Sequence, residues 1–480
     1  MGVGAETVTN PACIGIPPLG DGASLLSVTL ANAKGVGPSV TFSHIFVDYD
    51  SDFAYVGDDD GFLHKISPFF NAVGSLQEIA AAPWLASHAY SVGDVIVDTN
   101  GFIEECTTAG TSSGSSQPGW SPVWGANLPD SGTLHWTNLG SGGGWPIYVT
   151  GSTNHTDSSN LNAPILDTIS KNVFVGDQNG SLYYVLDPAF TGIGSCANGL
   201  SLYPCLGLPG IASPISPALG AQTDCATASP GPTCMVMSNI QGFTDGLVVD
   251  ASNALVITQF SNTDGTHNAV EQTDRTLSVF HSTPLGAGQA NALAHHTGAF
   301  DDSYFTDPTM GYYYICGPNT DQIETALYRV GFTNTSGTVA LATPVNGILH
   351  KLSHTGTSAN CAPLTEILNT SATVPHDWLF VSLDDHGSGP VCNNGSCVKS
   401  YDLGSTTMGN PMVTGPHAAY GSGTTGDLAD MMGTGGMIVD NNSNQPQASS
   451  IYFMPVSNTL TCGDTLVGGC AVKLTQAGLK

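Results

Sequence analysis

Three consecutive aspartates precede a glycine in the stretch AYVGDDDGFLHKI, at Asp58 to Asp60 and Gly61. Carboxylate oxygens are the ligands that Ca²⁺ prefers, so a calcium site on Asp58 and Asp60 is one interpretation. A D-x-D-x-D pattern also starts upstream at Asp48, but Phe53 stands where the calcium loop of an EF-hand has glycine. Asp and Gly are equally the residues that hairpin turns favour. The stretch predicts a hairpin turn, with a calcium site as the alternative.

Other acidic residues and histidines stand next to one another along the chain. Two carboxylates at one of two workable separations can cleave a glycosidic bond as acid and base. Neighbours on a strand point to opposite faces, however, so a pair in the sequence is not itself a catalytic pair. Non-catalytic function is therefore the leading interpretation. Four candidates are kept from the stretches GAFDDSY, VPHDW and SLDDHGSG: Asp301, Asp302, His376 and Asp385.

The balance of charges excludes several classes of partner. The 480 residues include 38 acidic and 9 basic side chains, which gives a formal net charge of -29. Clustered Lys and Arg bind nucleic acids and anionic membrane surfaces, so we expect no nucleic acid as a partner. The sequence also has no run of about 18 apolar residues, so we expect no membrane insertion.

The 12 cysteines indicate an oxidising compartment. Most form close pairs, and the repeated C-x2-C spacing of zinc sites is absent, so disulfides are expected. The pairs are Cys196 with Cys205, Cys225 with Cys234, Cys392 with Cys397, and Cys462 with Cys470, while Cys316 and Cys361 flank one long loop and Cys13 and Cys106 are left either paired or free. We expect a secreted protein, extracellular or at the cell surface. The initial stretch MGVGAETVTNPAC lacks a basic and apolar leader, so the signal peptide is absent from this chain.

The opening stretch is repeated, with substitutions, in VFVGDQNGSLYYV, which begins at Val173. In both copies an aspartate precedes the V-G glycine by nine positions, Asp48 before Gly57 and Asp167 before Gly176. Two weaker copies, after Asp250 and Asp307, keep this nine-residue spacing. Two more, near His376 and Asp440, do not keep it. Each copy alternates apolar and polar residues around a turn, as a half-buried hairpin does.

One hairpin cannot bury its own apolar face, so the six related units must stack. We predict an all-β fold, a single β-propeller of six or seven blades with a small inserted β module, stabilised by disulfides. The segment from Leu25 to Ala33 is expected to pair with the C-terminal CAVKLTQ and close the ring. Two sandwich domains are the alternative.

The repeats resemble the blades of pyrroloquinoline-quinone dehydrogenases and YVTN-type propellers, which read V-Y-V-G-x-x-D-G-x-L-Y. From about Ser43 onward the chain is similar to a family of secreted bacterial propeller proteins with YVGDDNG, FVGD, YVCG, LYRIGF and CAVK signatures. The matches here are Tyr55 to Gly61, Phe174 to Asp177, Tyr314 to Gly317, Leu327 to Phe332 and Cys470 to Lys473. The resemblance implies a fold and no particular activity. Quinone chemistry usually comes with an adjacent cysteine pair or a basic residue near the cofactor. Neither a Cys-Cys step nor a cluster of arginines is present here, so we expect no cofactor apart from the calcium ion considered above.

A module is inserted between the first two repeats. Gly57 and Gly176 are 119 residues apart, well beyond a blade of about 40 to 60 residues. The excess contains five of the six tryptophans: Trp84, Trp120, Trp124, Trp136 and Trp145. We assign residues 84–140 to the module and residues 1–83 and 141–480 to the propeller.

The module resembles chitin-binding type 3 modules of the family 5 and 12 kind. The match is the pattern W-x5-Y-x2-G-D-V from Trp84 to Val95, followed by ECTTAGTSSGSSQPGW and DSGTLHWTNLG. The resemblance implies a polysaccharide ligand that stacks on aromatic faces, with ligand candidates Trp84, Tyr90, Trp120, Trp124 and Trp136. Trp84, Tyr90 and Trp136 are expected in the core by their family positions. Trp120 and Trp124, in the loop QPGWSPVWG, are the better candidates for exposure.

These observations favour a secreted propeller that binds extracellular polysaccharide, a cell-surface glycan or another surface partner without catalysis. A propeller glycoside hydrolase or polysaccharide lyase with carboxylates at the channel mouth is the first alternative. The second is a structural subunit of an extracellular assembly, in which the chain self-assembles and the module is a spacer.

Overall fold

The computed structural model describes about half of the chain, and every structural statement below concerns that part. The described residues are 30, 43–59, 61–67, 69, 78, 82–92, 94–99, 102–121, 123, 126–141, 147–148, 160–170, 172–177, 181–186, 233–236, 246–250, 252–253, 255–261, 268–275, 280–285, 296–319, 324–335, 338–342, 348–353, 360–369, 376–383, 397–403, 434–440, 450–453 and 472–475. No described helix is long and apolar enough to cross a membrane.

The first repeat forms a four-stranded antiparallel sheet. Its strands are β1 (Phe46–Asp48), β2 (Phe53–Gly57), β3 (Phe62–Ile66) and β11 (Ile147–Tyr148), in that order. The turn between β2 and β3 contains the aspartates of the opening stretch, and Gly61 has a φ of 87° there. This left-handed conformation favours glycine. The predicted hairpin is therefore confirmed.

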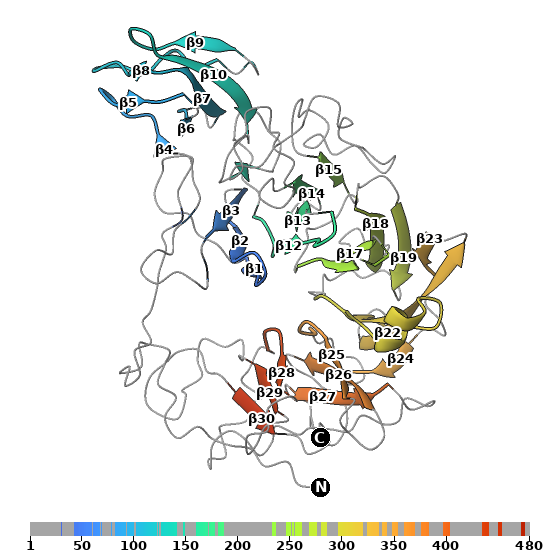
Figure 1. The fold of residues 1–480 in the computed structure, drawn as a ribbon. Helices are drawn as coiled ribbons and strands as arrows, with labels where there is room; N and C mark the ends of the chain where they lie inside the picture. The colour runs from blue at the N-terminus through green and yellow to red at the C-terminus, as the bar shows by residue number, and fades with distance from the viewer. Residues whose placement is uncertain are drawn as a thin grey trace, which may run out of the picture. The chain divides into compact units, whose positions relative to one another are not determined.

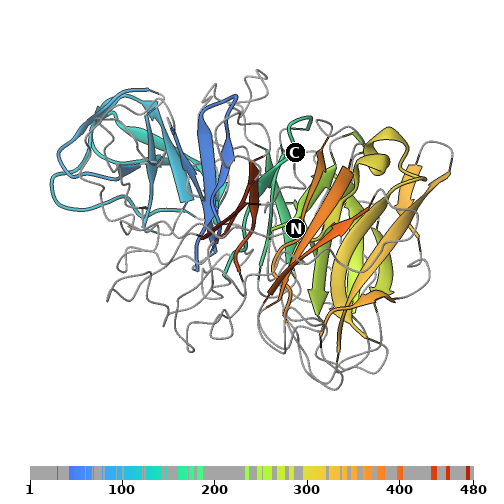
Figure 2. The same cartoon turned by 90° about the horizontal axis from the view of Figure 1, so that it is seen from below.

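Five further sheets follow (Figures 1 and 2). Their strands lie in chain order, except that in the third of these five sheets the last two strands both pair with the strand before them. They are, in the described residues, β12 (Ile165–Leu166), β13 (Asn172–Gly176), β14 (Ser181–Leu186) and β15 (Thr233–Val236); β16 (Val248–Asp250), β17 (Leu255–Ser261), β18 (Asn268–Asp274) and β19 (Phe280–Leu285); β20 (Ala299–Phe300), β21 (Tyr312–Pro318), β22 (Thr325–Thr335), β23 (Thr338–Leu341) and β24 (Ile348–Lys351); β25 (Thr365–Asn369), β26 (His376–Leu383) and β27 (Cys397–Asp402); and β28 (Ile438–Asp440), β29 (Ser450–Phe453) and β30 (Val472–Thr475). We number these sheets one to six from β1 to β30. Small sheets of sequential antiparallel strands have the topology of propeller blades.

The inserted module has sheets of its own. A five-stranded sheet runs β4 (Ala82–Pro83), β6 (Val95–Val97), β7 (Phe102–Thr108), β10 (His135–Ser141) and β9 (Asn127–Pro129), and β5 (Ala89–Tyr90) pairs with β8 (Gly110–Thr111). The module leaves sheet one after β3 and returns at β11, which pairs with β3. The host sheet therefore forms without any strand from the module.

The chain divides into two compact units, and each is described by itself. One comprises Leu26–Ile257 and Thr273–Phe280, and the other Met1–Leu25, Thr258–Gln272 and His281–Lys480. Sheets one and two lie in the former, and sheets four, five and six in the latter.

Sheets one and two pack face to face through the recurring glycine. Gly57 at the end of β2 faces Leu161, and a Cβ at position 57 would lie 2.5 Å from the Leu161 Cβ. The Leu161 N–H donates to the Asp58 carbonyl at 3.0 Å. Around this point a cluster of buried residues from both sheets forms a core: Tyr55, Leu63, Leu161, Leu166, Val173, Val175, Tyr183 and Val185. At Gly57, the next sheet therefore approaches the backbone too closely for a side chain.

The other face of β2 and β3 is also apolar. Ala54, Val56 and Ile66 lie there, and Leu30 packs against them. Apart from Leu30, the predicted closing segment from Leu25 to Ala33 lies outside the described residues.

A disulfide occupies the same place between sheets four and five. Strand register makes Cys316 equivalent to Gly57, and Cys361 equivalent to Leu161. The Cys316–Cys361 bond therefore links two sheets where van der Waals packing links sheets one and two. Cys106 is a buried free thiol, and every other predicted pair has a member outside the described residues.

The recurring aspartate ends the first strand of each sheet or directly follows it. The equivalent residues in the described sheets are Asp48, Asp167, Asp250, Asp301, Asn369 and Asp440. The carboxylates of Asp167, Asp250 and Asp301 accept backbone N–H groups of the turn that follows. Such local acceptors are why Asp and Asn favour turns.

The assignment of Asp307 to this position was wrong. The structure places Asp301 there, because a short helix, α2 (Asp302–Thr306), is inserted between β20 and β21. Asp307 is instead the residue that ends this helix.

Candidate functional site

The first place where charged side chains gather is the hairpin of sheet one. Asp58 is fully buried, and its Oδ1 accepts the Phe62 N–H at 2.7 Å. Its Oδ2 lies 3.1 Å from Nε2 of His64, whose Nδ1 lies 2.5 Å from Oε1 of Glu78. Burial lowers the pKa of His64, but hydrogen bonds to the two carboxylates outweigh it and raise this pKa to about 9. His64 is therefore a buried imidazolium between two carboxylates.

This arrangement bears on the calcium candidates. Both carboxylate oxygens of Asp58 bind groups of the hairpin itself, and Asp60 lies outside the described residues. Among the residues that the structure describes, no three His, Cys, Asp or Glu side chains are placed to hold a metal ion. The occupied oxygens of Asp58 make it a structural group of the turn, and a calcium ion bound to this turn stays a prediction.

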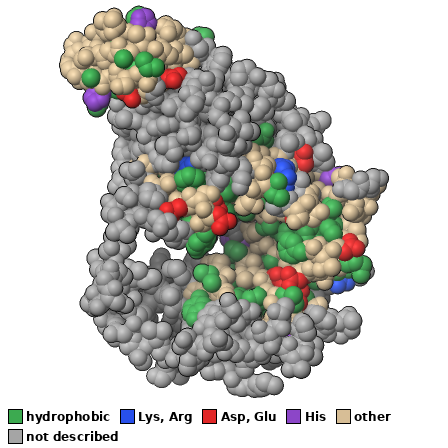
Figure 3. Space-filling model, in the orientation of Figure 1, with side chains coloured by type: hydrophobic (Ala, Val, Ile, Leu, Met, Phe, Trp, Pro, Cys, Tyr) green, Lys and Arg blue, Asp and Glu red, His purple; other side chains and the backbone are tan. Residues whose placement is uncertain are grey.

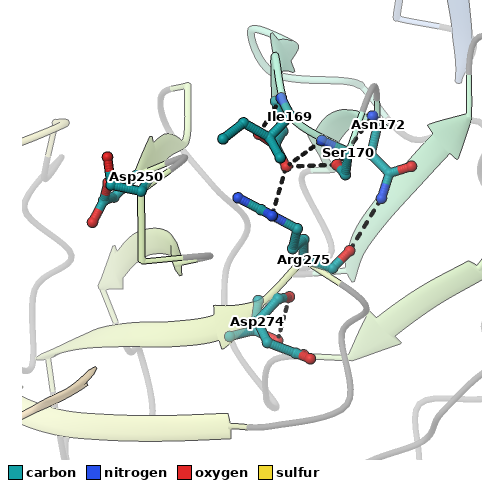
Figure 4. Close-up of polar contacts among 9 residues, drawn as sticks. Ile169, Ser170, Asn172, Asp250, Asp274 and Arg275 are labelled. Carbon is teal, nitrogen blue, oxygen red and sulfur yellow. Dashed lines mark hydrogen bonds and ion pairs between the residues drawn. The ribbon is translucent and has the colours of Figure 1, made fainter. Parts of the chain in front are cut away.

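A second ionic contact joins sheets two and three at the recurring aspartate. Nε of Arg275 lies 2.8 Å from Oδ2 of Asp167, and Nδ2 of Asn172 donates to the Arg275 carbonyl at 3.1 Å. Figure 4 shows the Arg275 side chain reaching the turn that contains Ile169 and Ser170. The contact ties the turn of one sheet to the end of β18 in the next. On the face shown in Figure 3, the described Lys and Arg side chains are scattered and form no basic patch.

The third and largest group is acidic and lies between sheets four and five. Glu366 faces Leu379 across β25 and β26, and Asp377 faces Leu368, so both carboxyl groups share one face. That face packs on sheet four, because Leu379 lies in one core cluster with Tyr314 and Leu327. The negative charges of Asp301 and Asp302, which directly follow β20 of sheet four, interact with those of Glu366 and Asp377.

Burial raises the pKa of Glu366 well above its usual range, and a hydrogen bond to the Asp377 carboxyl and the nearby negative charges add to the effect. The carboxyl group of Glu366 therefore keeps its proton at neutral pH. Oε1 of Glu366 and Oδ1 of Asp377 have no hydrogen-bond partner among the described residues. A buried acid that keeps its proton at neutral pH can act as a proton donor.

Asp301 is held by the backbone of its own turn. Its Oδ1 accepts the N–H groups of Tyr304 and Tyr312 at 3.0 and 3.1 Å. Burial raises the pKa of Asp301 to about 6, against the lowering effect of these two bonds. Burial likewise raises the pKa of Asp302, with a contribution from Asp377. Because Asp301 occupies the recurring position at the end of the first strand, its geometry is that of a turn cap.

A cation and two tyrosines complete this group. Arg329 pairs with Tyr314 across β21 and β22, and its guanidinium lies over the Tyr312 ring, 4.4 Å from the centroid. Burial raises the pKa of Tyr314, Asp301 adds to this, and Arg329 opposes it. Arg329 is therefore the positive counterpart on the sheet-four side.

His376 and Asp385 do not join this group in the described structure. His376 pairs through Nδ1 with Oδ2 of Asp402 at 2.7 Å, on the face of β26 opposite to Asp377. Asp385 lies outside the described residues. Sequence reasoning missed Glu366, because nothing next to it in LTEILN marks it; only the pairing of β25 with β26 brings it to Asp377.

In the module, most of the predicted aromatic ligands form the core. Trp84, Tyr90 and Trp136 are buried together with Ile96, Cys106 and Leu134. Both indole N–H groups, of Trp84 and Trp136, donate to Oδ2 of Asp130 at 2.7 and 3.1 Å. These side chains leave no open ring face for a sugar.

Trp120 lies at the margin of this core. Its ring packs edge-on against Trp136 with 6.2 Å between centroids, and its Nε1 donates to Oε1 of Gln117 at 2.8 Å. It is partly buried, and Trp124 and Trp145 lie outside the described residues. Leu85, Val92 and Val123 are exposed apolar residues of the same module. Trp120 thus keeps part of its surface available for contact.

Comparison with known proteins gave matches only among solved structures. No family model matches the chain, and no curated protein matches it. BamB from Moraxella catarrhalis aligns with 91% of this chain and 85% of its own, at 11% identity and a TM-score of 0.29. A GH74 xyloglucanase from Xanthomonas campestris aligns with 77% of this chain and 45% of its own, at 13% identity and a TM-score of 0.25.

A third structure, a DUF4784 family protein from Bacteroides caccae, aligns with 73% of this chain and 82% of its own, at 10% identity and a TM-score of 0.23. All three TM-scores are below 0.5. We therefore base the fold on the strand order and draw no functional conclusion from these structures.

Proposed function

We propose that this chain is a secreted β-propeller of six or seven blades that binds extracellular polysaccharide through its inserted module, without catalysis. The observation that carries the proposal is the way the module is inserted. It has its own sheets and core, and β3 and β11 of the host sheet pair without it. Because the module contributes nothing to the host sheet, a role toward an external partner explains its presence best.

The disulfide between sheets four and five supports the secreted location, since such bonds persist in oxidising compartments. The scarcity of basic side chains, 9 in 480 residues, favours a neutral ligand such as a polysaccharide over an anionic one.

Retention on insoluble chitin and cellulose tests this proposal. We expect the full chain to be retained, and Trp120→Ala and Trp124→Ala each to weaken retention up to about tenfold, the upper range for one aromatic contact. Tyr49→Ala is the matched control, because Tyr49 is an aromatic residue outside the module and is 77% exposed. Absence of retention by the unmodified chain would contradict the proposal.

A second candidate function is hydrolysis of a glycoside by the carboxyl groups between sheets four and five. It is favoured by the raised pKa of the buried Glu366 beside Asp377, and by one oxygen on each carboxyl that has no hydrogen-bond partner among the described residues. The experiment measures release of reducing ends from soluble polysaccharides. Activity that Glu366→Gln and Asp377→Asn abolish, and that the exposed Asp307→Asn leaves unchanged, would favour the enzyme; Asp385→Asn extends the test to a residue outside the described structure.

A further inference from the structure

A carboxyl group lies inside the module among apolar side chains. Glu104 on β7 is fully buried and stands opposite Ile96 of β6 and Asn138 of β10. It shares this face with Cys106, whose neighbour across β10 is Trp136. Burying a carboxylate in such a place is costly, so a group kept there needs a neutral form or a specific partner.

Glu104 has both. Burial, with the negative charge of Asp98 adding to it, raises the pKa of Glu104 to about 8, while the hydrogen bond from Asn138 opposes the rise. Asp98, in the turn after β6, is the charged group that faces it; β7 adds only the Cys106 thiol, and β10 adds Asn138 and Trp136, which do not ionise. The carboxyl is therefore neutral at pH 7.

The partner, Asn138, holds the loop that carries the candidate tryptophans. Oε1 of Glu104 accepts from Nδ2 of Asn138 at 2.8 Å, and the same Nδ2 donates to the Ser121 carbonyl at 2.6 Å. The backbone N–H of Asn138 donates to the Ala126 carbonyl at 2.9 Å. Asn138 thus fastens both ends of the segment from Ser121 to Ala126, which follows Trp120 and contains Trp124.

We propose that Glu104 is a positioning residue for the tryptophan loop: its carboxyl orients the Asn138 amide, which in turn holds Ser121 and the adjoining Trp120. The expected effect of Glu104 on ligand binding rests on the proposed function. The positioning of the loop does not depend on any ligand. The relay has three members, and two of them, Glu104 and Asn138, are fully buried.

Ionisation of Glu104 would alter the relay. The hydrogen bond from Asn138 favours the carboxylate, but burial and the charge of Asp98 oppose the ionised form more strongly. Ionisation is therefore expected to drive the Glu104 side chain toward water and away from Asn138 as the pH rises through about 8. Loss of one hydrogen bond on the loop is worth about 1 kcal/mol, or about a fivefold change in the affinity that the loop supports.

The experiment uses the full chain and follows acrylamide quenching of tryptophan fluorescence between pH 6 and pH 9.5, since five of the six tryptophans lie in or beside the module. We expect quenching of the unmodified chain to rise with a midpoint near pH 8. Glu104→Gln should keep the low-pH value throughout, and Glu104→Ala should be strongly quenched at every pH. Glu105→Gln, on the other face of β7, is the control and should titrate like the unmodified chain.

A titration that persists in Glu104→Gln would overturn the proposal, as would quenching that is the same in Glu104→Ala and the unmodified chain. Retention on chitin and cellulose is measured in parallel, where Glu104→Ala should bind about fivefold less. If fluorescence behaves as expected but the unmodified chain is not retained, the positioning role stands and the proposed function fails.

Discussion

Replacing Gly57 by alanine is expected to push sheet two away from sheet one. The new Cβ would lie 2.5 Å from the Leu161 Cβ and 3.1 Å from the Asn162 carbonyl oxygen. Carbon atoms in contact lie about 3.5–4.0 Å apart, so the overlap is about 1 Å. Both Cβ atoms are bonded directly to the backbone, and a change of rotamer cannot separate them.

Relief of this overlap needs backbone movement at a point where Leu161 also donates to the Asp58 carbonyl at 3.0 Å. Overpacking of a well-packed core costs about 1–3 kcal/mol. Because the clash involves no flexible side-chain end, we expect the upper end of this range, about 3 kcal/mol.

Urea unfolding followed by circular dichroism measures the effect. Gly119→Ala is the matched control, because a Cβ at Gly119 meets no atom within 4 Å. Leu161→Gly removes the opposing Cβ, so the Gly57→Ala and Leu161→Gly double variant should lose less stability than the two single variants together. An unchanged midpoint in Gly57→Ala, or strictly additive losses in the double variant, would refute the reasoning.

The disulfide, the buried histidine and the acidic group give three further predictions. Replacing both Cys316 and Cys361 by serine should lower the free energy of unfolding by about 4 kcal/mol in urea, because the bond closes a span of 45 residues in the unfolded chain; an unchanged midpoint would contradict this. His64→Gln should cost about 3–5 kcal/mol at pH 7, because it removes the cation that lies between two buried carboxylates. Since the folded-state pKa of about 9 lies above 6.5, the stabilisation by His64 is complete below pH 6.5 and declines through pH 9, and thermal unfolding across this window should show a decline that the variant lacks. Glu366 keeps a proton in the folded state that the unfolded chain loses above pH 4.5, so stability should fall as the pH rises from 4.5, and Glu366→Gln should flatten this dependence; equal slopes in both proteins would exclude it.

Local patterns were enough to predict the hairpins. The alternation of apolar and polar residues marked β2, β3, β13 and β14, and the glycine after Val56 and Val175 marked the ends of β2 and β13. These features depend on the period of a strand and on the space available to one residue, and both can be read along the chain. The all-β fold class is confirmed for the same reason.

The register of the fourth repeat could not be read in this way. The nine-residue spacing selected Asp307, whereas the pairing of β20 with β21 selects Asp301. An inserted turn of helix changes the spacing without changing the strands, so a count along the chain fails where hydrogen-bonded pairing does not.

For the aspartates, too, the sequence predicted the local structure but not the interactions between strands. The sequence by itself determined that Asp58 stands in a turn and that Asp301 and Asp302 are neighbours. Only the tertiary structure decided that Asp58 binds His64 and that Asp301 caps a turn beside Glu366 and Asp377. The physical reason is that a turn is made by adjacent residues. An ion pair or a group of buried carboxyls instead requires side chains from separate strands to meet, and that meeting depends on how whole sheets pack.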